Sequence, residues 1–154
     1  MPGRTWILTG SPENYAATRE RGFSLIGLKE RNRNRALEIT PEDRIVLYLT
    51  RVKGFAARIR VTGELFEDRE PVWPGKPGKV DPYPWRFATE PELVLEEEEW
   101  VAAEELAGEL EHVAKWPPEH WTLAFQGQIR PVSDRDARTL ENRMGAAVGA
   151  RGRA

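Results

Sequence analysis

The segment from Val80 to Phe87 holds two prolines, an arginine and, among its aromatic residues, Tyr83 and Trp85. Pro82 and Pro84 fix their own φ angles and push the residue before each of them towards extended geometry. Tyr83 and Trp85 are therefore presented from a stiff backbone. Because these side chains combine a flat apolar ring with a polar tip, they suit a partly exposed surface that binds planar ligands. The segment predicts one wall of a ring-binding site, and the alternative is that Trp85 belongs to the core.

A second segment, Lys29 to Arg35, carries four basic residues and two amides with no apolar member. It cannot be a buried element, so we expect a loop or an exposed helical turn. Guanidinium groups match phosphate oxygens in pairs, and Asn can read base edges. The segment predicts an arm that contacts a nucleic-acid backbone, and a solvated loop is the alternative. The predicted phosphate-binding residues are Lys29, Arg31, Asn32, Arg33, Asn34, Arg35 and Arg86.

Composition favours a single cytoplasmic domain. The 154 residues can bury one sizeable core and are too few for two ordinary domains. No cysteine is present, which excludes disulfides and thiolate nucleophiles. No apolar stretch has the length of a signal peptide or a membrane span. We expect one domain over residues 1–144 and a disordered tail over residues 145–154, which offers little apolar surface to bury.

Charge is unevenly distributed along the chain. The net charge is −2, yet residues 1–60 hold twelve of the 23 basic residues and only six of the 25 acidic ones. This asymmetry permits a nucleic-acid-binding face on the first part of the chain and a solvated acidic face on the second.

Signatures of catalysis are missing from the sequence. It has no Ser/His/Asp spacing and no glycine-rich phosphate loop, and neither His112 nor His120 has a partner motif. The four carboxylates of Glu96 to Glu99 point in different directions, so they predict a solvated edge and no metal site. We expect a binding protein without metal or cofactor, and an enzyme acting on a small molecule or nucleotide is a weaker alternative.

The first half of the chain predicts a strand, a helix and a hairpin. Residues 5–9 are typical of a strand, and Ser11 and Pro12 are an N-cap and a first helical residue for a helix to about Arg21. Residues 23–28 predict a short strand. The strongest strand pattern lies at 44–50, and a glycine-containing turn at 52–55 joins it to an alternating strand at 56–65.

The second half predicts a long loop before further strands and helices. Residues 66–82 contain four prolines and Trp73, a composition that excludes a regular element and is typical of a functional loop. A strand should follow over 85–95 with an interruption near Pro91, then a short helix over 102–110. Residues 121–126 predict a last strand, and Ser133 with Asp136 predicts the start of a final helix that ends near Met144.

Element order and four local strings resemble the EVE domain, a PUA-like fold related to the YTH domains that read methylated adenine in RNA. The resemblance covers residues 4–144, and its strings lie at 6–15, 39–48, 83–87 and 121–127. It implies an α+β fold with a twisted, mainly antiparallel sheet that forms a partly closed barrel flanked by helices. It also implies a pocket at the barrel mouth for a modified base in DNA or RNA. The related readers carry a tryptophan at the position that matches Ile26.

To read a methyl group, a protein must take the base out of its stack, sandwich the ring between flat apolar surfaces and satisfy its polar edge. Trp73, Tyr83 or Trp85 can supply the ring that Ile26 does not. Donors and acceptors for the edge of the base come from Thr9, Asn14, Asn32, Asn34 and Gln126. A protein-interaction module that uses Trp73 and the proline loop is the alternative. The residues expected around the base are Trp6, Thr9, Asn14, Tyr15, Ile26, Trp73, Tyr83, Trp85, Phe125 and Gln126.

Overall fold

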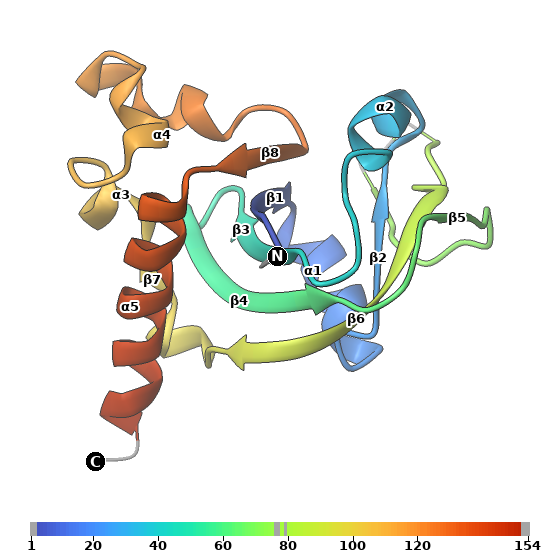
Figure 1. Ribbon diagram of the computed structural model, residues 1–154, viewed down its shortest axis with the longest axis horizontal. Coiled ribbons are helices and arrows are strands. Elements are labelled where there is room, and N and C mark those ends of the chain that lie inside the picture. Colours follow the sequence, from blue (N-terminus) through green and yellow to red (C-terminus); the bar gives the residue numbers. More distant parts are fainter. Residues whose placement is uncertain (1–2, 76–77, 79, 152–154) are drawn as a thin grey trace.

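The computed structural model describes residues 3–75, 78 and 80–151. Its main feature is one mixed sheet with the strand order β2-β6-β4-β3-β1-β8, and two short strands pair on this path, β5 with β6 and β7 with β4. The sheet curls into a half-barrel with helices around it (Figure 1). The strands are β1 (Thr5–Gly10), β2 (Leu25–Leu28), β3 (Arg44–Leu49), β4 (Gly54–Val61), β5 (Phe66–Glu67), β6 (Trp85–Val94), β7 (Val101–Ala102) and β8 (Ile129–Val132).

The expected α+β fold class is confirmed, because the sheet forms a partly closed barrel and the helices lie around it. Most strand pairs are antiparallel, but β1 and β3 run parallel, with Thr5 beside Arg44 and Gly10 beside Leu49. Parallel neighbours need a crossover connection. Here the crossover is long and contains two helices, a 3-10 turn and a further strand. The helices are α1 (Pro12–Glu20), α2 (Arg33–Ala36), α3 (Ala103–Leu106), α4 (Glu111–Ala114) and α5 (Asp134–Arg151), with 3-10 turns η1 (Glu30–Asn32), η2 (Glu97–Glu99) and η3 (Pro118–Phe125).

Local signals account for α1. The Ser11 hydroxyl accepts a hydrogen bond from the Asn14 N–H at 3.1 Å, and Pro12 occupies the first turn. At the other end, Gly22 adopts a φ of 67°, a left-handed conformation that ends helices at little cost in glycine. The helix thus begins and ends where the sequence indicates.

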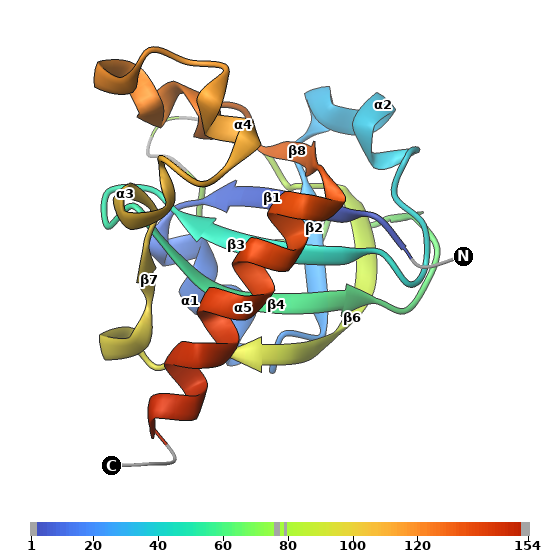
Figure 2. The same cartoon turned by 60° about the vertical axis from the view of Figure 1, so that its left-hand side comes forward.

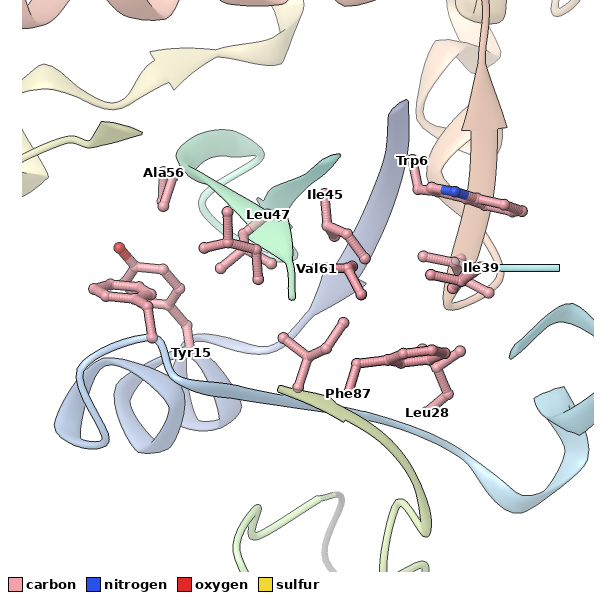
Figure 3. Close-up of a cluster of buried hydrophobic side chains, with 14 of the residues drawn as sticks. Trp6, Tyr15, Leu28, Ile39, Ile45, Leu47, Ala56, Val61 and Phe87 are labelled. Carbon is pink, nitrogen blue, oxygen red and sulfur yellow. The ribbon is translucent and has the colours of Figure 1, made fainter. Parts of the chain in front are cut away.

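The curled sheet has an apolar cluster on each of its two faces. The inner cluster lies inside the half-barrel and includes Trp6, Tyr15 and Phe87 (Figure 3). The outer cluster includes Tyr48, Phe55 and the buried sides of α3, α4 and α5. The alternation of side chains along a strand explains why β1 and β3 contribute to both clusters.

Three C-terminal expectations do not agree with the structure. The first is the strand over residues 121–126: residues 121–125 form the end of η3, because Phe125 stacks on Tyr48 with ring centroids 4.3 Å apart and so draws the segment onto the outer cluster. The last strand is instead β8, which lies at the sheet edge beside β1. Its Pro131 is tolerated there, since an edge strand leaves one row of backbone groups unpaired.

The expected helix over residues 102–110 is also absent as a continuous element. A turn that includes Gly108 separates α3 from α4. Asp136, which is 1% exposed, accepts hydrogen bonds from the N–H groups of Glu111 and His112 at 2.9 Å each. The acid expected near the start of α5 therefore also caps the start of α4.

Helix α5 continues beyond the expected boundary at Met144. It runs through Arg151, and Ala147 and Val148 pack against the outer cluster. Residues 145–151 are thus part of the fold, because two small apolar side chains one residue apart can both reach the cluster. Residues 152–154 of the expected tail lie outside the described part of the chain. Within the described residues, no helix combines the length and apolar character needed to cross a bilayer.

Candidate functional site

A pocket opens between the ends of β1 and β3, helix α1, strand β2 and the proline-rich loop. The empty space in and around it, open solvent at the mouth included, is about 430 Å³. Six of the residues expected around a base line it: Thr9, Asn14, Tyr15, Ile26, Trp73 and Tyr83. Leu8, Leu47 and Leu49 supply an apolar floor. The pocket thus combines an apolar interior with four aromatic side chains, those of Tyr15, Tyr48, Trp73 and Tyr83.

Trp73 and Tyr83 form an aromatic pair in the pocket. Their ring centroids lie 5.8 Å apart in an edge-to-face arrangement, and both side chains are buried. The Trp73 ring passes over Gly27, where an added Cβ would lie 2.5 Å from a ring carbon. Gly27 therefore leaves the space that the tryptophan ring occupies. Trp73 and Ile26 both line the pocket, and the ring comes from the loop and not from β2.

Hydrogen bonds fix both rings to helix α1. The Trp73 indole N–H donates to the Thr18 hydroxyl at 2.9 Å, and the Asn14 amide donates to the Tyr83 hydroxyl at 3.1 Å. The Asn14 carbonyl oxygen also accepts from the Gly75 N–H at 3.0 Å. Both ends of the Asn14 amide are thus occupied in holding the loop, which leaves this side chain a supporting role at the pocket.

Arg86 also holds the proline-rich loop in place. Its guanidinium is 1% exposed and donates to the carbonyls of Tyr83, Pro82 and Glu70. It also lies over the Trp73 ring, 5.2 Å from the centroid. Burial lowers its pKa from the usual value, and the nearby Asp68 carboxylate partly opposes that shift. The expectation that Arg86 binds phosphate is not met, because its donors are used inside the fold.

Two tyrosine hydroxyls at the pocket stay protonated at neutral pH. Burial raises the pKa of Tyr15, and it raises the pKa of Tyr48 to about 12. Both side chains line the pocket. They can therefore act as neutral hydrogen-bond donors towards a bound molecule.

The pocket continues outward into a wider basic cleft of about 1350 Å³ to its open mouth. Thr9, Gly10 and Tyr83 are among the residues that line both spaces. Phe125 and Gln126, which were expected around the bound nucleobase, line this outer cleft instead. Four cationic side chains also line it: Lys29, Arg31, Arg51 and Lys53.

Gln128 is a site residue that the sequence did not reveal. Its carbonyl oxygen accepts from the Lys29 N–H at 2.7 Å and from the Asn32 amide at 2.8 Å. Its own amide lies 3.5 Å from the Gly27 carbonyl. The side chain thus bridges the gap between the segment before β8 and the end of β2, the two edge strands. Only Gly127, with a φ of 83°, hinted at a special conformation here.

Several other expected residues lie away from the pocket. Trp6 is fully buried, and its indole N–H donates to Asp43 at 3.0 Å. The Trp85 indole N–H donates to the Glu30 carbonyl at 3.0 Å, and the Arg33 guanidinium lies over the Trp85 ring, 5.5 Å from its centroid. Core packing and the bend of the loop therefore keep both tryptophans from the pocket.

The expected basic arm is divided by the structure. Lys29 and Arg31 reach the cleft, whereas Asn32 is bonded to Gln128. Arg35 pairs with Glu38 at 3.8 Å, one helical turn away. Asn34 is exposed and lines neither space. The arm curls into η1 and α2, so its side chains point to several sides.

No carboxylate or imidazole cluster accompanies the pocket. The described residues contain no group of three His, Cys, Asp or Glu side chains that could hold a metal ion. His112 is half-buried, and its ring nitrogen lies 2.6 Å from the Ala124 carbonyl. Burial lowers its pKa from the usual value. His120 is exposed on η3.

Comparison with known proteins gives similarity in structure alone. No family model and no curated protein sequence matches the chain. The YTH domain of Zygosaccharomyces rouxii MRB1, solved in complex with N6-methyladenosine RNA, aligns with a TM-score of 0.66 and 11% identity over 92% of this chain and 86% of that one. The Mmi1 YTH domain in complex with RNA aligns with a TM-score of 0.65 and 11% identity, over 97% and 82% respectively.

A hypothetical protein from Leishmania major aligns with a TM-score of 0.64 and 14% identity, over 94% of this chain and 96% of that one. Identities this low define the fold and leave the function open. The chain therefore has a YTH-like α+β fold.

Proposed function

We propose that this chain is a non-enzymatic nucleic-acid-binding module that takes a flipped, methylated base into the pocket beside Trp73 and Tyr83. The observation that carries the proposal is an apolar, ring-lined pocket that opens directly into a cleft with four cationic side chains. The YTH-like fold and the sequence strings that resemble EVE domains support the same function. The partner is DNA or RNA, and the proposed location is cytoplasmic.

The chemistry of such a site follows from its parts. Stacking on an aromatic side chain contributes about 1 to 3 kcal/mol per base. Trp73 offers an indole and Ile26 an apolar side chain in the same pocket, and each can cover the ring of the base or its methyl group. Thr9 and Tyr48 lie at the pocket as hydroxyl donors or acceptors for the polar edge of the base. Outside, lysine and arginine side chains meet the phosphates.

The alternative functions have less support. Trp73 is 9% exposed and faces the pocket, so it offers little surface to a protein partner. An enzyme would need a nucleophile and a base within hydrogen-bonding reach. The two histidines lie outside the pocket lining.

A substitution at Gly10 tests the pocket. Side chains two residues apart share one face of a strand, so a side chain at Gly10 would lie on the face of Leu8, which packs towards the inner cluster. An added Cβ meets no atom within 4 Å, and the backbone there is unstrained. Gly10→Leu should therefore fold and fill the mouth.

The measurement is binding to a panel of fluorescent DNA and RNA oligonucleotides that differ only in one methylated base. The parent should prefer one modified base, and Gly10→Leu should weaken that binding about ten- to hundred-fold, the range that one lost stacking interaction gives. Gly108→Leu, at another open position between α3 and α4, is the matched control. Equal binding of modified and unmodified oligonucleotides by the parent would contradict the proposal.

A further inference from the structure

The cations of the cleft come from two elements that lie apart. Lys29 and Arg31 follow β2, at the start of η1. Arg51 and Lys53 belong to the turn that joins β3 to β4. In both Figure 1 and Figure 2, this turn and the η1–α2 segment are well separated. The described residues that line the cleft include no carboxylate.

The turn between β3 and β4 is held in an unusual conformation. Arg51 has a φ of 65° and Lys53 a φ of 54°, a region that residues with a Cβ rarely adopt. Strain of this kind persists only where surrounding contacts enforce it. Here the Thr50 N–H donates to the Gly10 carbonyl and the Ala103 N–H donates to the Lys53 carbonyl, both at 2.9 Å. The backbone is fixed on both sides while both side chains stay exposed.

Arg51 already has an anionic partner of the kind that a ligand could replace. It pairs with Glu13 on α1, and both side chains are more than half exposed. The pair lowers the pKa of Glu13 and raises that of Arg51, mainly through their shared hydrogen bond. Exposed ion pairs of this type are weak. A phosphodiester offers the same single charge and two non-bridging acceptor oxygens as a carboxylate, and it can meet Arg51 and Lys53 together. It can therefore compete with this weak pair.

We propose that the bound base belongs to an internal nucleotide, with Lys29 and Arg31 binding the phosphate on one side of it and Arg51 and Lys53 binding the phosphate on the other. This inference rests on the proposed function. An internal nucleotide is flanked by two phosphates, whereas a terminal one has a single linkage. Cations on two separated elements at one pocket mouth match the first arrangement. In the absence of nucleic acid, Arg51 pairs with Glu13.

Four ligands test the arrangement. The first is the modified nucleoside selected by the panel above, with N6-methyladenosine tried first. The others are the two dinucleotides that carry one uridine, on the 5′ side or on the 3′ side of the modified nucleoside, and the trinucleotide that carries a uridine on each side. The trinucleotide should bind about ten-fold more tightly than either dinucleotide. The double variant Arg51→Ala with Lys53→Ala should lose about ten-fold for the trinucleotide and for one dinucleotide. Its affinity for the other dinucleotide and the nucleoside should stay within about two-fold of the parent.

Two further variants define the role of the ion pair. Glu13→Gln removes the competing carboxylate, so it should raise trinucleotide affinity about two- to three-fold at low salt without changing nucleoside affinity. Arg143→Ala is the control. That arginine also pairs with exposed carboxylates, Glu105 and Glu109, but lies on α5 outside the cleft.

The outcomes separate this inference from the proposed function. If the nucleoside binds but the trinucleotide binds no better than the dinucleotides, the two-sided clamp is overturned and the pocket function stands. Equal competition by an acidic peptide would likewise overturn it, since the cleft would then be a general anion surface. If none of the four ligands binds the parent, both proposals fail.

Discussion

At the scale of single residues, Arg86 links the inner sheet to the pocket. We predict that Arg86→Lys lowers the free energy of unfolding by about 1 to 3 kcal/mol, because a lysine cannot reach all the loop carbonyls that the guanidinium serves. Base binding should weaken as well, since Trp73 and Tyr83 lose their fixed positions. Chemical denaturation and oligonucleotide titration measure the two effects. Arg143→Lys is the exposed control, and an unchanged affinity in Arg86→Lys would contradict the positioning role.

Asp43 is the second residue whose role is decided by its hydrogen bonds. It is 2% exposed and accepts from the Trp6 indole and from the backbone N–H groups of Arg4 and Thr40. We predict that Asp43→Ala lowers the free energy of unfolding by about 2 to 4 kcal/mol, because it leaves several buried donors unpaired. Urea denaturation checks the value. A loss below about 0.5 kcal/mol would mean that water replaces the carboxylate.

At the scale of elements, α5 packs on the outer face of the sheet from Leu140 to Val148. Ala147 and Val148 pack against the outer cluster. We predict that Val148→Ser lowers the free energy of unfolding by about 1 kcal/mol, because it replaces a partly buried apolar side chain with a polar one. Thermal unfolding followed by circular dichroism measures the change. Ala146→Ser, at an exposed position of the same turn, should leave stability almost unaltered.

At the scale of the whole molecule, the cleft concentrates positive charge although the net charge is −2. We predict that oligonucleotide binding weakens with salt. If the four cations of the cleft neutralise the two phosphates that flank the base in a single strand, the slope of log K against log salt should be about −1.4. Titrations between low and moderate salt give the slope. A slope near zero would exclude phosphate contacts as a source of affinity.

Stability should also depend on pH through His112. Burial lowers its pKa below the ordinary value, so the unfolded chain binds a proton more readily than the folded one. The free energy of unfolding should therefore fall as the pH drops from about 6.5 towards the folded pKa, and be regained on returning to neutral pH. Lys115, Arg130 and Asp136 are the charged groups near the ring.

Chemical denaturation at several pH values measures this dependence. His112→Gln should remove most of it, since the amide does not titrate. His120→Gln should retain it, because that side chain is exposed on η3. Equal pH dependence in the parent and in His112→Gln would assign the effect to other groups.

Local signals in the sequence determined a large part of the fold. Ser11, Pro12 and Gly22 define the ends of α1, since caps act within a few residues. The alternating pattern and the turn around Gly54 predict the β3–β4 hairpin for the same reason. The proline loop, its Trp73 and the basic segment after β2 were also recognisable, because composition alone excludes a regular or buried element there.

Only the tertiary structure decided which of these residues meet. The parallel pairing of β1 with β3, the edge strand β8 and the bridge made by Gln128 join segments far apart in the chain, and no local pattern encodes such partners. The same holds for Trp73, which lies over β2 because Gly27 leaves room for its ring. Arg51 and Lys53 looked like ordinary hairpin residues in the sequence. They line the cleft because the turn between β3 and β4 is anchored to both β1 and α3.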